Sequence, residues 1–292
     1  MGACTIADGR LLVGDVELEV FHQGAGHALL LLHGGQGLDH KAPFLRMLAR
    51  DFEVIAPSHP GFGRSDLPGR FDSVDDLAYL YLDLIEQLEV RGLVLAGFSF
   101  GGWIAAEVAI RCAHRLDRLI LVSPVGIKIG ARETRDIPDI FALSPEQVHK
   151  LAFHTPVTGA ADYSSLTDDE LRIMVRNRET LALYTWEPYM HNPKLRYRLR
   201  RIRIPTLIMR GASDGIVSQA YAESYAALIP GARLEVIPAA AHFPQIEQPE
   251  ALVKRLVEFA RGVRHAAAIH RAGTGGESSE RNSAISQSGA PR

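Results

Sequence analysis

The chain has 292 residues and a nearly balanced charge, with 32 Lys and Arg residues against 34 Asp and Glu residues. This length suits one large domain or two small ones and can bury a core without disulfides or a structural metal. The net charge of −2 lacks the basic footprint of a nucleic-acid-binding protein. The longest apolar run, 28–32, is far too short to cross a bilayer. Two cysteines and no secretory signal favour a reducing, cytoplasmic location.

Predicted strands alternate with predicted helices in two stretches of the chain, before about 126 and after about 203. Asp8-Gly9 predicts a tight turn between two short strands, and 16–21 alternates apolar and acidic residues like a half-exposed strand. Later short runs are apolar at nearly every position, which is typical of strands covered on both faces. These runs are 28–32, 53–56, 92–96, 119–122, 206–209 and 234–237. Helical spacing follows at 74–88, 103–110, 219–228 and 249–259, the first capped by Asp72 or Ser73. The order predicts an α/β fold with a mostly parallel sheet and helices on both faces.

The alternation stops between about 126 and 203. Helical patterns at 145–153 and 168–182 fill this stretch, with almost no strand signal, so we predict a helical insertion between two strands of one sheet. The core is then 1–126 with 204–263, and the insertion is 127–203. Residues 264–292 have no aromatic side chain and are rich in Ala, Gly, Ser and Arg, which predicts a disordered tail.

The strongest local motif is Gly-Phe-Ser-Phe-Gly-Gly at 97–102, centred on Ser99. It follows a buried strand and opens a helix, which is the context of a Gly-x-Ser-x-Gly nucleophile elbow. So sharp a turn strains the serine backbone and leaves no room for side chains two residues away, hence Gly97 and Gly101. The motif alone is also compatible with a glycine-rich turn that carries a capping serine.

Two further residues complete a catalytic triad in order and context. A serine hydroxyl needs a base, and His242 follows the strand predicted at 234–237. The base needs an acid, and Asp214 follows the strand predicted at 206–209. In isolation Asp214 also suits a turn that binds its own backbone. We predict that Ser99, Asp214 and His242 meet at one edge of the sheet.

The 33–37 segment, His-Gly-Gly-Gln-Gly, follows the strand at 28–32. Acyl transfer needs N–H donors for the oxyanion of the tetrahedral intermediate. We expect the backbone N–H groups of Gly35 and Phe100 to supply them, and His33 to brace the turn rather than act as a base.

Together these motifs resemble the α/β-hydrolase superfamily from about 16 to 263. The matching pieces are Leu-His-Gly-Gly at 32–35, Ala-Pro-Ser-His-Pro-Gly-Phe-Gly-Arg-Ser at 56–65, the elbow at 97–101, Gly-Ala-Ser-Asp at 211–214 and Ala-His-Phe-Pro at 241–244. The resemblance implies an α/β-hydrolase fold in which the insertion is a helical cap over the active site. It implies a serine hydrolase with a small-molecule substrate and with neither cofactor nor metal.

Subfamily features narrow the chemistry. Haloalkane dehalogenases and epoxide hydrolases carry aspartate where this chain has Ser99. Carbon–carbon hydrolases of ring-fission products usually carry Asn before the serine and Trp after the histidine, where this chain has Phe98 and Phe243. An esterase is therefore the first hypothesis, a carbon–carbon hydrolase the second, and a non-catalytic ligand receptor the third. We expect Gly34, Phe98, Trp186 and Phe243 to line the substrate pocket. The sequence indicates neither the substrate nor the oligomeric state.

Overall fold

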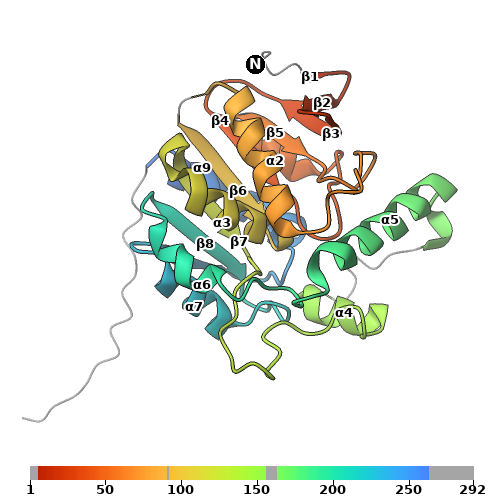
Figure 1. Cartoon of the computed structure of the whole chain (residues 1–292). Helices are drawn as coiled ribbons and strands as arrows, with labels where there is room; N and C mark the ends of the chain where they lie inside the picture. The colour runs from red at the N-terminus through yellow and green to blue at the C-terminus, as the bar shows by residue number, and fades with distance from the viewer. Residues whose placement is uncertain (1–5, 91, 156–162, 263–292) are drawn as a thin grey trace, which may run out of the picture.

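A computed structural model of the protein describes residues 6–90, 92–155 and 163–262. The tail predicted to be disordered, 264–292, lies outside the described residues. The whole chain is drawn in Figure 1.

One nine-stranded sheet forms the centre of the described structure, in the order β1-β2-β3-β5-β4-β6-β7-β8-β9. The strands from β5 to β9 in this order pair in parallel, and the first four pair antiparallel. Their bounds are β1 (Ile6–Ala7), β2 (Arg10–Val13), β3 (Val16–Gln23), β4 (Ala28–Leu32), β5 (Glu53–Pro57), β6 (Leu93–Phe98), β7 (Leu116–Val122), β8 (Thr206–Gly211) and β9 (Arg233–Ile237). The predicted mostly parallel sheet is confirmed, as is the turn at Asp8-Gly9.

Helices cover both faces of the sheet, and the apolar strands explain why. Along β4, Leu30 and Leu32 belong to one buried cluster, and Leu29 and Leu31 belong to the other. Successive side chains of a strand point to opposite faces, so a strand that is apolar throughout serves two cores. The prediction of a strand covered on both faces is wrong for β9, where only Ile237 is fully buried. The reason is that β9 lies at the edge of the sheet and pairs only with β8.

The core helices follow their sequence signals closely. They are α1 (Pro43–Leu48), α2 (Val74–Gln87), α3 (Phe100–Cys112), η1 (Ala113–Arg115), α7 (Gln219–Leu228), α8 (Pro244–Glu247) and α9 (Pro249–Ala260). Ser73, rather than Asp72, caps α2, with its side chain accepting the Asp76 N–H in a capping box. The short helices α1 and α8 had no expected counterpart, because four to six residues carry too little periodicity.

The described part of the segment between β7 and β8 consists of helices joined by irregular stretches and has no strand. It contains α4 (Pro145–Ala152), η2 (Tyr163–Ser165), α5 (Asp168–Thr185), α6 (Leu195–Arg198) and η3 (Leu199–Arg201). We refer to residues 127–203, the range proposed from the sequence, as the cap. Figure 1 shows α4 and α5 standing out from one end of the sheet core. Among the described helices, none is both long and apolar enough to cross a membrane.

Candidate active site

Ser99 lies in a strained turn between β6 and α3. Its backbone has φ 51° and ψ −111°, outside the regions that side-chain-bearing residues prefer. A Cβ at Gly97 would lie 2.3 Å from the Gly101 carbonyl oxygen, and one at Gly101 would lie 2.2 Å from the Leu32 oxygen. Both positions therefore require glycine. The Ser99 N–H donates to the Val122 oxygen at 2.8 Å, which ties the turn to the end of β7.

Three side chains from three different loops meet at this turn. His242 Nε2 lies 2.8 Å from Ser99 Oγ. On the other side of the imidazole, Nδ1 lies 3.0 Å and 3.2 Å from the two carboxylate oxygens of Asp214. The three residues predicted to meet do so, because parallel strands deliver their following loops to one edge of the sheet.

Asp214 is held as a carboxylate. Its Oδ1 atom accepts the N–H groups of Ile216 and Val217, each at 2.9 Å. Burial alone would raise the pKa of Asp214, but the electrostatic interaction and hydrogen bond with the His242 imidazole, together with the Val217 N–H, lower it below its usual value. A buried carboxylate in this state fixes the His242 proton on Nδ1, which leaves Nε2 free to accept a proton from Ser99.

The 33–37 loop lies directly against the elbow. A Cβ on Gly34 would be 3.5 Å from Ser99 Cβ and 3.4 Å from the Phe98 oxygen. The Gly34 oxygen accepts His33 Nδ1–H at 2.7 Å and the Gly37 N–H at 3.1 Å. Across a planar trans peptide, C=O and N–H point in opposite directions. The bonds to the Gly34 oxygen therefore also fix the direction of the Gly35 N–H.

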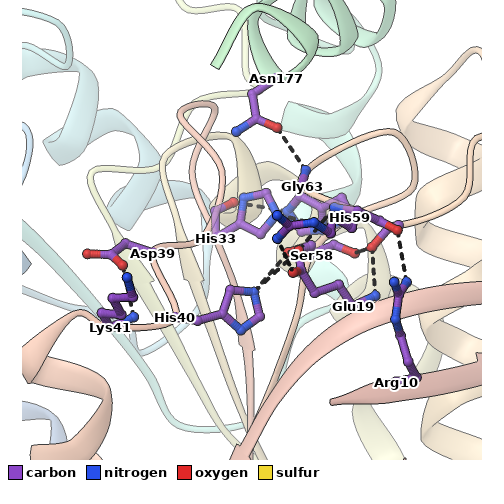
Figure 2. Close-up of polar contacts among 12 residues, drawn as sticks. Arg10, Glu19, His33, Asp39, His40, Lys41, Ser58, His59, Gly63 and Asn177 are labelled. Atoms are coloured by element: carbon purple, nitrogen blue, oxygen red, sulfur yellow. Dashed lines mark hydrogen bonds and ion pairs between the residues drawn. The ribbon is translucent and has the colours of Figure 1, made fainter. Parts of the chain in front are cut away.

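A buried pair of histidines supports this loop from below. The His59 N–H donates to His33 Nε2 at 2.9 Å, so the proton of neutral His33 must be on Nδ1. His59 Nε2 donates to the His33 carbonyl at 3.0 Å, so its Nδ1 accepts the Tyr81 hydroxyl. Burial lowers the pKa of His33 to about 4 and that of His59 well below 6.5, and a nearby imidazole lowers each pKa further: His40 acts on His33, and His33 acts on His59. Figure 2 shows the two rings side by side.

Helix α5 of the cap rests on the other side of the same loop. Asn177 Nδ2 donates to the Gln36 oxygen at 2.9 Å, and its Oδ1 accepts the Gly63 N–H at 2.8 Å. Figure 2 shows Asn177 reaching Gly63 from the side opposite His59. Thr180 donates to the Gly61 oxygen at 2.9 Å. The cap thus contacts the 33–37 loop and the 58–66 loop through one helix face.

The end of α4 contacts the other two loops of the site. The Gly215 N–H donates to the Leu151 oxygen at 2.9 Å, and the His242 N–H donates to the Ala152 oxygen at 3.0 Å. Phe153 packs its ring against Phe243, with centroids 5.1 Å apart. We call residues 151–155 the α4 end.

Of the four residues expected to line the substrate pocket, two lie beside the triad and two pack elsewhere. Gly34 lies against Ser99, and the Phe243 ring lies edge-on to His242 with centroids 5.1 Å apart. Phe98 is buried beside Phe44 on the α1 side of the sheet. Trp186 is 59% exposed and packs on Phe141 within the cap.

Several residues at the site had no motif to reveal them. Leu181 lies over the 33–37 loop, 2.5 Å from where a Gly35 Cβ would be, and belongs to the helix face of Asn177 and Thr180. Polar residues at positions i, i+3 and i+7 of a helix share one face, so Asn177, Thr180 and Tyr184 were a usable signal. His59 lay within a matched motif but without an assigned role. Among the described residues, no group of three or more His, Cys, Asp or Glu side chains is placed to hold a metal.

A family model described as the alpha/beta hydrolase family matches residues 29–255. With this fold, this elbow and this match, the chain belongs to the alpha/beta hydrolase family and is an enzyme of that family.

The relatives of the chain include hydrolases of more than one kind. A 2-hydroxy-6-oxo-2,4-heptadienoate hydrolase of Pseudomonas putida is 28% identical over 268 residues, covering 86% of this chain and 95% of that protein. Carboxylesterase YbfK of Bacillus subtilis is 26% identical over 255 residues, covering 80% of each. Among solved structures, a meta-cleavage product hydrolase (CumD) matches with a TM-score of 0.70 at 23% identity, over 87% of this chain and 97% of that one, which is a likeness of fold. A thermophilic esterase from Thermogutta terrifontis matches with a TM-score of 0.66 at 25% identity, over 85% of this chain and 94% of that one.

Proposed function

We propose that the protein is a serine hydrolase that cleaves a carboxylic ester of a small molecule through an acyl-enzyme. The observation that carries this proposal is the unbroken chain from Ser99 Oγ to His242 Nε2 at 2.8 Å and from His242 Nδ1 to Asp214 at 3.0 Å. A hydroxyl, a base within hydrogen-bond reach and an acid that orients the base are the requirements for an activated serine nucleophile.

In the first half-reaction, Ser99 Oγ attacks the ester carbonyl carbon while its proton moves to His242 Nε2. The carbonyl electron pair moves onto oxygen, and the N–H groups of Gly35 and Phe100 bind the oxyanion. When the intermediate collapses, the carbon–oxygen bond of the alcohol breaks, and His242 returns the proton to the leaving alkoxide. Asp214 stabilises the imidazolium in between. A water molecule, deprotonated by His242, then attacks the acyl-enzyme and releases the acid and Ser99.

The surroundings of Ser99 favour an apolar acyl or alcohol group of small or medium size. Leu181 and Phe243 are both more than nine-tenths buried and lie against Gly35 and His242, respectively. Gly34 forms the wall nearest the nucleophile, and the Phe98 side chain packs away from it against Phe44. Trp186 is a candidate for the outer rim of the pocket, where its exposed ring would contact a longer substrate.

The direct test compares wild type with Ser99→Ala on p-nitrophenyl esters of increasing acyl length. We expect turnover to fall by at least ~10³-fold in Ser99→Ala, because removal of the nucleophile leaves only binding and oxyanion stabilisation. A fluorophosphonate probe should label the wild type at Ser99, which peptide mass spectrometry would locate. Undiminished turnover in Ser99→Ala would overturn the assignment. Absence of labelling in folded wild type would favour a ligand receptor on the same fold.

A second candidate, hydrolysis of a carbon–carbon bond in a ring-fission product, is favoured by one observation. The 28% identical relative from Pseudomonas putida bears the name of a hydrolase of such a dienoate and is covered over 95% of its length. Parallel assays with a vinylogous diketone acid and with simple esters distinguish the two. Turnover of the esters alone removes the carbon–carbon reaction, and preference for the dienoate would replace the ester assignment.

A further inference from the structure

A carboxylate outside the triad joins the cap to the loop that carries the base. Glu247, at the end of α8, accepts the Ala241 N–H on Oε2 at 2.7 Å. Its other oxygen, Oε1, accepts the N–H of His154 at 2.8 Å and that of Thr155 at 3.0 Å. Ala241 directly precedes His242, and His154 and Thr155 belong to the α4 end. One side chain therefore bridges the loop of the base and the α4 end, which lies more than 90 positions before Glu247 in the chain.

The backbone around His242 is also held by bonds from the core: the Ala239 oxygen accepts the Gln248 side chain at 3.1 Å, and the Ala240 oxygen accepts the Ser213 N–H at 2.9 Å. It follows Ala239, which has φ +53°, so the chain turns sharply before the base. The His242 N–H donates to Ala152 in the α4 end, so this bond also depends on where the α4 end lies. His154 adds a contact on the acid side, because its Nδ1 lies 2.8 Å from Ser213 Oγ, next to Asp214. The α4 end thus contacts the loops of both acid and base, and Glu247 holds it there.

We propose that Glu247 is a positioning residue for His242. Its carboxylate holds the Ala241–His242 backbone and the α4 end in the positions that bring His242 Nε2 to Ser99. The chemistry suits the task, since a carboxylate has two acceptor oxygens and its bonds to N–H groups are roughly twice as strong as those between neutral groups. Glutamine has nearly the same shape but one acceptor oxygen. In either orientation the NH₂ group of glutamine faces an N–H donor. Glu247→Gln therefore loses the hydrogen bond from Ala241 or the hydrogen bonds from the α4 end.

This inference rests on the proposed serine hydrolase function, so its test needs one readout that depends on that function and one that does not. The first readout is the rate at which a fluorophosphonate labels Ser99, with kcat and KM for a p-nitrophenyl ester. The second is the proton NMR signal of the His242 Nδ1–H, which reports its hydrogen bond to Asp214 whatever the substrate. Glu250→Gln is the matched control, because it removes an exposed carboxyl three positions further along the chain.

In Glu247→Gln we expect the labelling rate and kcat to fall about 10-fold to 100-fold with KM within about twofold, since a small misplacement of a catalytic group acts on the chemical step. The His242 Nδ1–H signal should move upfield or broaden, and Tm should stay within about 8 °C of wild type. Glu250→Gln should match wild type in every measurement. Glu247→Asp, which keeps the charge but shortens the reach, should recover less than half of the lost rate.

Two results overturn the inference. One is a folded Glu247→Gln protein that labels at the wild-type rate. The other is an unchanged His242 Nδ1–H signal in Glu247→Gln, which decides the matter even if wild type is not labelled. Absence of labelling in wild type counts against the proposed function, so the two failures are distinguishable. If Glu247→Gln does not fold, Glu247→Asp gives the same readouts, and wild-type behaviour there overturns the inference.

Discussion

The 33–37 loop and the 239–243 loop flank Ser99 from two sides, and they are held by different kinds of group. Around the 33–37 loop the supports are uncharged: two neutral histidines below and the amide of Asn177 above. Around the 239–243 loop they are carboxylates, namely Asp214 on the imidazole and Glu247 on the backbone. Both loops also contact the cap, the first through α5 and the second through the α4 end. We therefore expect the two sides of the site to lose activity or stability under different conditions.

The largest effect is expected on the carboxylate side, from Asp214→Asn. The amide cannot hold the His242 proton on Nδ1 as a carboxylate does, so the wrong tautomer of the base faces Ser99. We expect kcat to fall by ~10⁴-fold with the fold retained. Glu235→Gln, which removes a carboxyl paired with Arg255 on β9, is the control and should retain wild-type turnover. Retention of turnover within about tenfold in Asp214→Asn would contradict the assigned role.

As pH falls, stability should be lost first on the uncharged side of the site, around the 33–37 loop. The pKa of His33 is about 4 in the folded protein against 6.5 for the free side chain, so the unfolded chain binds its proton first as pH falls. The free energy of unfolding should therefore decrease between pH 6.5 and about 4, by roughly 3 kcal/mol from His33 alone. The pKa of Asp214 is lowered instead, so its contribution is lost only below its usual value of 3.8.

Urea denaturation at a series of pH values measures this window. His33→Asn is the comparison, because it lacks a group that titrates there, and its stability should change less between pH 6.5 and 4. Equal slopes for the two proteins would show that His33 does not contribute.

A smaller effect is expected from Asn177→Asp, an isosteric change on the α5 side. Aspartate keeps the acceptor for the Gly63 N–H but places a second oxygen against the Gln36 carbonyl, which displaces the 33–37 loop. A broken buried hydrogen bond costs about 1–3 kcal/mol, so we expect kcat to fall about tenfold.

Thr180→Val separates docking of α5 from positioning of the 33–37 loop. It removes the bond to the Gly61 oxygen in the 58–66 loop and leaves Asn177 in place. Its Tm should fall while kcat stays near wild type. An equal loss of kcat in the two variants would mean that α5 acts only by covering the site.

Among the variants expected to lose activity, Gly35→Ala should lose the least. The new Cβ would lie 2.5 Å from Leu181 Cδ2, the end of a flexible side chain that can rotate away, and no positive φ opposes alanine there. We expect a kcat decrease of about threefold, equivalent to less than 1 kcal/mol. Adding Leu181→Ala should restore kcat, measured on the same ester. A double variant that is worse than Gly35→Ala would show that the contact with Leu181 is not the cause.

The sequence alone was enough to predict the fold and the residues at the centre of the site. The fully apolar run that became β4 and the glycines at 97 and 101 are local requirements, because a doubly covered strand and a strained elbow each tolerate few residue types. The order of Ser99, Asp214 and His242 behind successive strands then placed them at one edge. The strand at 234–237 was predicted as covered on both faces because edge position leaves no mark in so short a segment.

The supports of the two loops were decided only by the tertiary structure. No local motif identifies the partners of Asn177 and Glu247: each acts by reaching backbone groups between 6 and 141 positions away in the chain. A backbone N–H or C=O is present at every non-proline residue, so its partner depends on how the chain packs and not on which residues it contains. The sequence therefore determined which residues carry the proposed chemistry of Ser99, and folding decided which residues hold them in place.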